Sequence, residues 1–134
     1  MSAPQSVTIA VDIGQQETAG VGDPNDYYTC HGQAGEWRLE SAFYMPEITT
    51  AAAGSNYFSL TIGQGVAGSS TDVSSALTNA STAHTLGVAR EFTLTENTSR
   101  EYGASDTIIV ELEETGSSAN IAGVLVMAFT QVRV

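Results

Sequence analysis

Two histidines, one cysteine and a group of glutamates are the residues whose types could support catalysis in this chain. Cys30 and His31 are adjacent in the sequence. Because neighbouring side chains on a strand point to opposite faces, they make a poor nucleophile–base pair. His84 lies in a segment rich in Thr and Ala, where we expect an ordinary surface histidine. The sequence also lacks the Gly-x-Ser-x-Gly turn that exposes a serine nucleophile.

Glu111, Glu113 and Glu114 could perform glycoside hydrolysis, in which paired carboxylates act as acid and base. Glu111 and Glu113 share one face of a predicted strand, opposite Leu112. No aromatic residue that would bind a sugar flanks them. We therefore expect a solvated acidic strand face and predict that the protein is not an enzyme.

Metal and cofactor sites are equally poorly supported by the residue spacing. Zinc needs three or four Cys, His or carboxylate ligands, which one cysteine and two distant histidines do not supply. Asp23, Asn25 and Asp26 are weak candidates for a cation site, because they place oxygen ligands in one loop. An ordinary turn is the main expectation there. The glycine-rich segment 63–68 lacks the lysine and helix start of a phosphate site, so we expect no cofactor.

Cys30 is the one cysteine of the sequence, so no disulfide can form within the chain. Two alternatives remain for it. It could pair with a cysteine of another chain, or it could be a small buried residue, which is the interpretation we favour.

The charge balance is unusual. The sequence has 15 acidic residues and four basic ones, with a formal net charge of −11, and it contains no lysine. Nucleic acid and anionic membranes need positive charge, so we expect neither as a partner. Molar salt screens the repulsion between such acidic copies. We therefore favour a halophilic origin, with an ordinary acidic surface protein as the alternative.

The chain reads as a series of strands with turn signals between them. The N-terminal segment 7–13 alternates apolar and polar residues, as a half-buried strand does. In the segment 37–46, alternation predicts Trp37, Leu39, Phe43 and Met45 on one face. It predicts Arg38, Glu40 and Tyr44 on the other face. The last run, 121–134, is apolar on both faces, which is typical of a strand covered on both sides.

About eight such segments are present, and no amphipathic helix longer than two turns. The fold class we predict is all-β, a single-domain antiparallel β-sandwich of jelly-roll type. Residues 1–35 are expected to form an N-terminal strand and a loop or arm, and residues 36–134 the sandwich itself.

The order of segments from Trp37 onward resembles the small jelly-roll capsid decoration proteins of tailed viruses, known as cement or head-spike proteins. The resemblance covers residues 36–134 and depends on the order of its motifs. In chain order these are Phe43-Tyr44-Met45-Pro46, the alanine-rich 49–54, 56–61, Ala76-Leu77-Thr78, Phe92-Thr93-Leu94-Thr95, 103–106, 108–113 and Glu114-Thr115-Gly116.

This resemblance implies a non-catalytic structural protein on the outer surface of a virion, commonly a homotrimer bound to a major capsid protein. We expect the contacts between copies on the N-terminal strand and the final strand, at Val7, Ile9, Val11, Val124, Val126 and Val132. The alternative is that both strands pair within one subunit. The alternative function is a receptor- or glycan-binding module, whose candidate surface aromatics are Tyr27, Tyr28, Trp37 and Tyr102.

Overall fold

The computed structural model describes residues 5–13, 25–65, 70–95, 100–116 and 121–133. These residues contain ten strands and no α-helix. The strands are β1 (Ser6–Asp12), β2 (Asn25–Thr29), β3 (Glu36–Pro46), β4 (Tyr57–Gln64), β5 (Thr71–Asp72), β6 (Leu77–Thr78), β7 (Arg90–Glu91), β8 (Glu101–Tyr102), β9 (Ile108–Thr115) and β10 (Gly123–Arg133).

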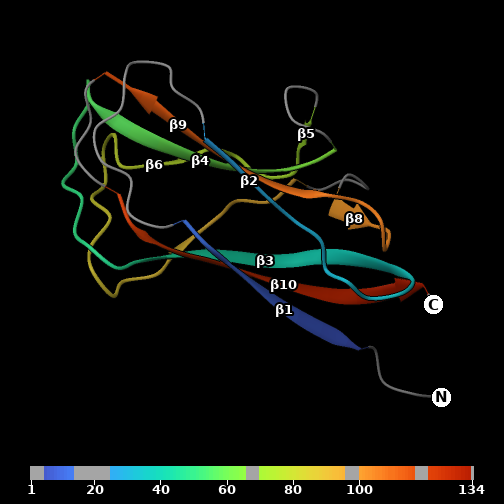
Figure 1. The fold of residues 1–134 in the computed structure, drawn as a ribbon. Coiled ribbons are helices and arrows are strands. Elements are labelled where there is room, and N and C mark those ends of the chain that lie inside the picture. Colours follow the sequence, from blue (N-terminus) through green and yellow to red (C-terminus); the bar gives the residue numbers. More distant parts are fainter. Residues whose placement is uncertain (1–4, 14–24, 66–69, 96–99, 117–120, 134) are drawn as a thin grey trace.

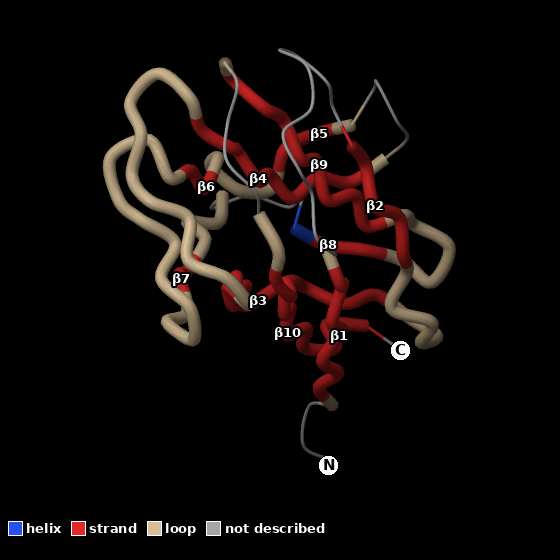
Figure 2. Tube along the Cα trace, turned by 60° about the vertical axis from the view of Figure 1, so that its left-hand side comes forward, coloured by secondary structure: helices blue, strands red, loops and turns tan. Residues whose placement is uncertain are grey.

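The strands form two antiparallel sheets that lie face to face (Figure 1). The first sheet has the order β1-β10-β3-β7, with β8 also paired to β3. The second sheet has the order β2-β9-β4-β5, with β6 also paired to β4. The two layers are seen again from another side in Figure 2, where β1, β10 and β3 lie below and β4, β9 and β2 above.

The connectivity is that of a jelly roll. The chain crosses from one sheet to the other after β1, β2, β3, β6, β8 and β9. If β5 with β6, and β7 with β8, are each counted as one broken strand, eight strands make two four-stranded sheets, as a jelly roll requires. The predicted all-β sandwich is therefore confirmed. Within residues 1–35, β1 and β2 each supply an edge strand of one sheet.

The core lies between the sheets and is built by the inward residue of every second position. β4 and β9 contribute Leu60, Ile62, Val110 and Leu112, all at most 1% exposed. β10 contributes Leu125, Met127 and Phe129 from the opposite sheet. Two buried tyrosines donate their hydroxyl hydrogens to backbone carbonyls, and one of these bonds joins the two layers.

One of these tyrosines, Tyr102 of β8 in the first sheet, donates a hydrogen bond to the Gly63 carbonyl of β4 in the second. Its ring also lies edge-on to Phe129, with 5.6 Å between ring centroids. The other, Tyr44, donates to the Ala122 carbonyl just before β10. Each phenol is thus both an apolar core group and a satisfied buried polar group.

A β-bulge in β3 overturns the predicted faces of that strand. Leu39 pairs with Phe129 and Ser41 pairs with Ala128, so Glu40 is the extra residue. Because side chains alternate with a period of two, one extra residue exchanges the faces beyond it. Tyr44 is therefore buried, and Phe43 and Met45 point outward.

Two other segments form less strand than their sequence pattern indicates. Over 73–78 only β6 is a regular strand, and Ser74 makes an isolated bridge to Leu94. The segment 88–95 forms only the two-residue β7, with Val88 exposed and Phe92 buried.

Candidate interaction surface

The outer side of the first sheet carries a cluster of apolar side chains on three neighbouring strands. Val124 of β10 pairs with Met45 of β3, and Val126 lies between Ala10 of β1 and Phe43 of β3. Phe43 and Met45 are each 37% exposed. Side chains directly opposite each other in antiparallel strands are in contact range. We call these five residues the apolar outer face.

The sequence pattern predicts two of these five residues. The two-sided apolar pattern of the last strand indicates Val124 and Val126. Strict alternation along β3 places Phe43 and Met45 in the core instead. The available signal for the bulge is Ser41, a polar residue that strict alternation places inward.

The three predicted interface residues of β1 lie on its inward side. Val7, Ile9 and Val11 are half-buried and pack against the core. Their register partners on β10 are the buried residues Phe129, Met127 and Leu125. β1 pairs along its whole length with β10, and its second edge pairs with no described strand. A contact between that edge and a neighbouring copy stays a prediction.

Val132, the last predicted interface residue, is set apart from Val124 and Val126. Gln131 pairs with Trp37 and Arg133 pairs with Glu36, so Val132 sits at a second irregularity between them. It is partly exposed. The structure thus separates the six predicted residues into an inward group, an outward pair and one residue at the far end of β10.

A loop beside β3 extends the exposed apolar surface. The Gly87 N–H donates to the Pro46 carbonyl at the end of β3, and the Leu86 N–H donates to Thr49 Oγ1. Leu86 and Val88 are 59% and 55% exposed. Exposed large apolar residues that gather at one place, rather than singly, indicate a contact surface.

Charge is absent from the centre of this face and present around it. The outward residues of β10 from Val124 to Thr130 are uncharged. Two carboxylates lie directly opposite residues of the face, because Asp12 pairs with Val124 and Glu91 pairs with Phe43. Both carboxylates therefore lie at the border of the apolar outer face, Asp12 on β1 and Glu91 on β7.

The far end of the same sheet is charged. Arg38 Nη2 lies 2.7 Å from Glu101 Oε1. Arg133 pairs with Glu36 and lies 3.7 Å from Glu101. Exposed ion pairs of this kind contribute little to stability. They do satisfy two of the four arginines within the chain itself.

The outer side of the second sheet has the opposite character. Glu111 pairs with Thr61, and Glu113 pairs with Ser59. We call these four residues the acidic outer face. Glu114, the third residue of the glutamate run, faces inward opposite Phe58 and is buried. The predicted sharing of one face by Glu111 and Glu113 is confirmed.

His84 is fully buried, and the expectation of a surface histidine is wrong. Its backbone exchanges two hydrogen bonds with Thr50, which carries the loop inward. Its ring lies edge-on to Tyr44 with 5.0 Å between centroids. Arg90 Nη1 lies 3.3 Å from Nδ1, so Nδ1 accepts and the proton resides on Nε2.

Burial, and then the charge of Arg90, lower the pKa of His84 from 6.5 to about 4. Arg90 itself is held by the carbonyls of Thr78 and Thr82. Nε2 has no hydrogen-bond partner among the described residues. The contacts of His84 with Thr50, Tyr44 and Arg90 thus anchor the loop that carries His84 to the core.

Cys30 is exposed, so the favoured prediction of a buried cysteine is wrong. The reason is the alternation that places His31 inward, because neighbouring residues take opposite sides. The His31 ring is buried between Trp37 and Phe129, and Nε2 lies 3.0 Å from the Gly103 carbonyl. The two side chains point apart, as predicted, and cannot form a dyad.

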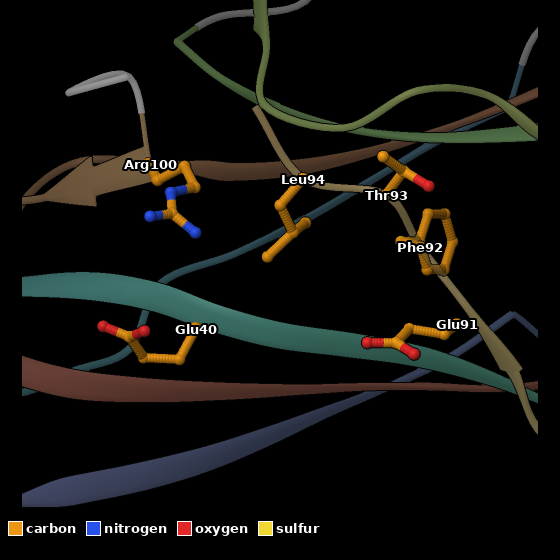
Figure 3. Close-up of a pocket in the computed structure, with 6 residues that line it drawn as sticks. All are labelled: Glu40, Glu91, Phe92, Thr93, Leu94 and Arg100. Atoms are coloured by element: carbon orange, nitrogen blue, oxygen red, sulfur yellow. The ribbon is translucent and has the colours of Figure 1, made fainter. Parts of the chain in front are cut away.

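A pocket of about 450 Å³ opens beside the β3 bulge (Figure 3). It is lined by Glu40, Glu91, Phe92, Thr93, Leu94 and Arg100. The Arg100 guanidinium points toward the strand that carries Glu40. Arg100 Nε is buried and has no hydrogen-bond partner in the described part of the chain. The pocket therefore combines one cation with two carboxylates at its wall.

Of the four aromatic residues predicted as a glycan-binding surface, two are core residues. Trp37 and Tyr102 are buried. The Tyr27 hydroxyl donates to the Ile13 carbonyl at 2.7 Å, which joins the two sheet edges. Tyr28 is 52% exposed. These four rings do not form a shared stacking platform.

The predicted cation site has no structural account. Asp23 and the side chains of Asn25 and Asp26 lie outside the described residues. Elsewhere in the described ranges, no three His, Cys, Asp or Glu side chains converge in a way that would hold a metal. Within the same ranges, no helix has the length and apolar character needed to span a bilayer.

Comparisons with known proteins identify no family for this chain. No protein-family model matches the chain, and no curated protein does. One similar solved structure is that of the infectious bursal disease virus Gx strain, with a TM-score of 0.35 and 10% sequence identity. The match covers 99% of this chain and 43% of that one. A TM-score this low does not establish a common fold.

Proposed function

We propose that this protein is a non-catalytic structural protein of a virion, which decorates and stabilises the outer surface of a tailed-virus capsid. The observation that carries the proposal is the apolar outer face on an otherwise acidic jelly roll. A protein that acted alone in solution would gain nothing by exposing this cluster. A protein that packs against neighbouring copies of itself on a particle surface needs such a face.

The motif order of residues 36–134 supports the same proposal, because it resembles that of capsid decoration proteins. Jelly rolls also serve other functions, so the fold by itself does not select this one. We propose in addition that the protein binds a major capsid protein, in a virus of a halophilic host. The absence of lysine and the net charge of −11 support the last point.

A second candidate function is a glycan- or receptor-binding module on a virion or cell surface. One observation favours it. The pocket beside Glu40 offers acceptors from two carboxylates and donors from Arg100, which together could bind the hydroxyl groups of a neutral sugar. Tyr28 is the exposed ring among the four candidates, and it does not line this pocket. Ring stacking would therefore contribute little to sugar binding there.

Antibodies against the purified protein, applied to intact particles from the source of the sequence, test the proposal. By immunogold electron microscopy we expect the antibodies to label the surface of the virus head. We also expect particles stripped of the protein to lose their integrity at a lower temperature than complete particles. Label confined to the cell lysate, or unchanged particle stability, would overturn it. Retention on a glycan array that Arg100→Ala abolishes would favour the second candidate.

A further inference from the structure

We infer that the apolar outer face is covered by the same face of a second copy of this chain, in a contact that forms in molar salt and not in dilute salt. The inference deepens the proposed function, on which it rests for its place on a particle, by naming the partner of this face.

The chemistry of the face excludes most other occupants. Its five residues carry no charge, and the charged residues directly opposite them in register are the carboxylates Asp12 and Glu91. Nucleic acid and anionic lipid need cations, which the face does not offer. A basic partner would prefer the acidic outer face of the other sheet. The occupant must therefore be apolar and uncharged, and this face of a second copy has that composition.

The arrangement of the first sheet favours a two-fold contact. Its apolar half holds Val124, Val126, Phe43 and Met45, and its other end holds the Arg38–Glu101 pair. A head-to-tail contact would place the apolar half of one copy on the charged end of the next and remove these ion pairs from water, which is costly. A two-fold axis through the apolar half places like on like and leaves both charged ends in solvent.

Charge sets the salt dependence. Each copy brings a net charge of −11, and Glu91 lies next to Phe43 at the edge of the contact. The chain has no lysine that could balance these carboxylates. The Debye length falls from about 10 Å at 0.1 M salt to about 3 Å at 1 M. Salt therefore removes the repulsion and leaves the apolar attraction in place.

The test is the solution mass by light scattering at about 0.1 M and about 3 M salt, where screening differs most. We compare the natural chain, the double variant Phe43→Ser with Val126→Thr, and Tyr28→Ser as a control. The control also removes an exposed aromatic residue, but from the second sheet. We expect the natural chain and the control to be about twice as heavy as the double variant at high salt, as a two-fold contact requires.

Circular dichroism at each salt concentration identifies folded samples. Ala10→Glu is a second variant, which adds a carboxylate to the face at an exposed position and serves if the double variant unfolds. Equal masses of all chains at high salt, or equal loss in the Tyr28→Ser control, would overturn the inference.

Particle binding measured in parallel separates this inference from the proposed function. A doubling in solution that depends on the face, without any binding to particles, would leave the inference standing and refute the capsid role. Particle binding by the natural chain, together with equal solution masses for the natural chain and both face variants, would support the capsid role and refute the inference.

Discussion

The two outer faces of this sandwich belong to sheets with the same number of strands, yet one is apolar and the other acidic. Both sheets bury their inner faces in one shared core, so both inner faces have to be apolar. Nothing in folding makes the same demand on the outer faces. Carboxylates and hydroxyls on the second sheet are the ordinary solution for a solvated strand face. The partly exposed valines of β10, with Phe43 and Met45 on β3, are not, and this departure is the part of the molecule that points to a partner.

The largest effect is expected where the backbone supports the apolar outer face. A Cβ added at Gly123 of β10 would lie 2.5 Å from the Met45 carbonyl oxygen and 2.5 Å from the Tyr44 ring. Gly123→Ala should therefore lower the free energy of unfolding by about 3 kcal/mol. A thermal melt should show this as a fall in Tm of about 10 °C.

The matched change in the second sheet is Gly63→Ala on β4. There the added Cβ meets the Thr71 carbonyl at 3.2 Å and Ser70 at 3.3 Å, which asks for much smaller shifts. We expect a loss of about 1 kcal/mol or less. If both variants melt at the same temperature, the close approach of β10 to Tyr44 is not what constrains the first sheet.

The second prediction concerns the anchor behind Tyr44. His84 is neutral in the fold down to a pKa of about 4, whereas in the unfolded chain it takes up a proton near pH 6.5. The unfolded state therefore binds more protons between these values, and stability falls as the pH is lowered from 6.5 to 4. The full loss is about 3 kcal/mol.

His84→Gln cannot titrate, so the difference in stability between the two chains should change by this amount across that window and stay constant above about pH 7. Denaturant unfolding at a series of pH values measures it. The carboxylates titrate in both chains and cancel in the difference. A constant difference from about pH 7 to about pH 4 would show that His84 is not held neutral in the folded protein.

A third prediction makes the acidic outer face resemble the apolar one. Ser59 and Glu113 are direct register partners at partly or fully exposed positions. Replacing both with valine should change the free energy of unfolding by less than about 0.5 kcal/mol, because neither residue has a core role. In molar salt the variant should form larger assemblies than the natural chain, since both faces could then self-associate. An unchanged mass distribution would mean that the shape of the apolar outer face matters more than its composition.

The smallest effect is expected from the edge of the apolar outer face. Glu91→Gln removes one carboxylate beside Phe43 and should lower the salt concentration at which the mass doubles. Glu113→Gln removes the same charge from the other sheet and is the matched control. Equal shifts for the two variants would indicate that net charge, rather than the position of Glu91, governs the association.

How much could be predicted differs between the fold and the candidate surface. The sequence predicted a two-sheet sandwich with about eight strands, because alternation with a period of two and turn residues are local signals. It also predicted the outward pair Val124 and Val126 and the shared face of Glu111 and Glu113. These depend only on alternation within one uninterrupted strand, which the chain itself specifies.

Two of the errors share one physical origin, since each concerns a residue whose environment is set by a distant segment. The bulge at Glu40 depends on the register of β3 against β10, which lies at the other end of the chain. His84 is buried because its loop pairs with Thr50 and covers Tyr44. Local sequence therefore specifies the strands, their inner and outer periodicity and the acidic charge. Which side of β3 faces out is settled by strand pairing in the folded protein. A single extra residue exchanges the inward and outward faces of the strand beyond it, and composition does not determine where that residue lies.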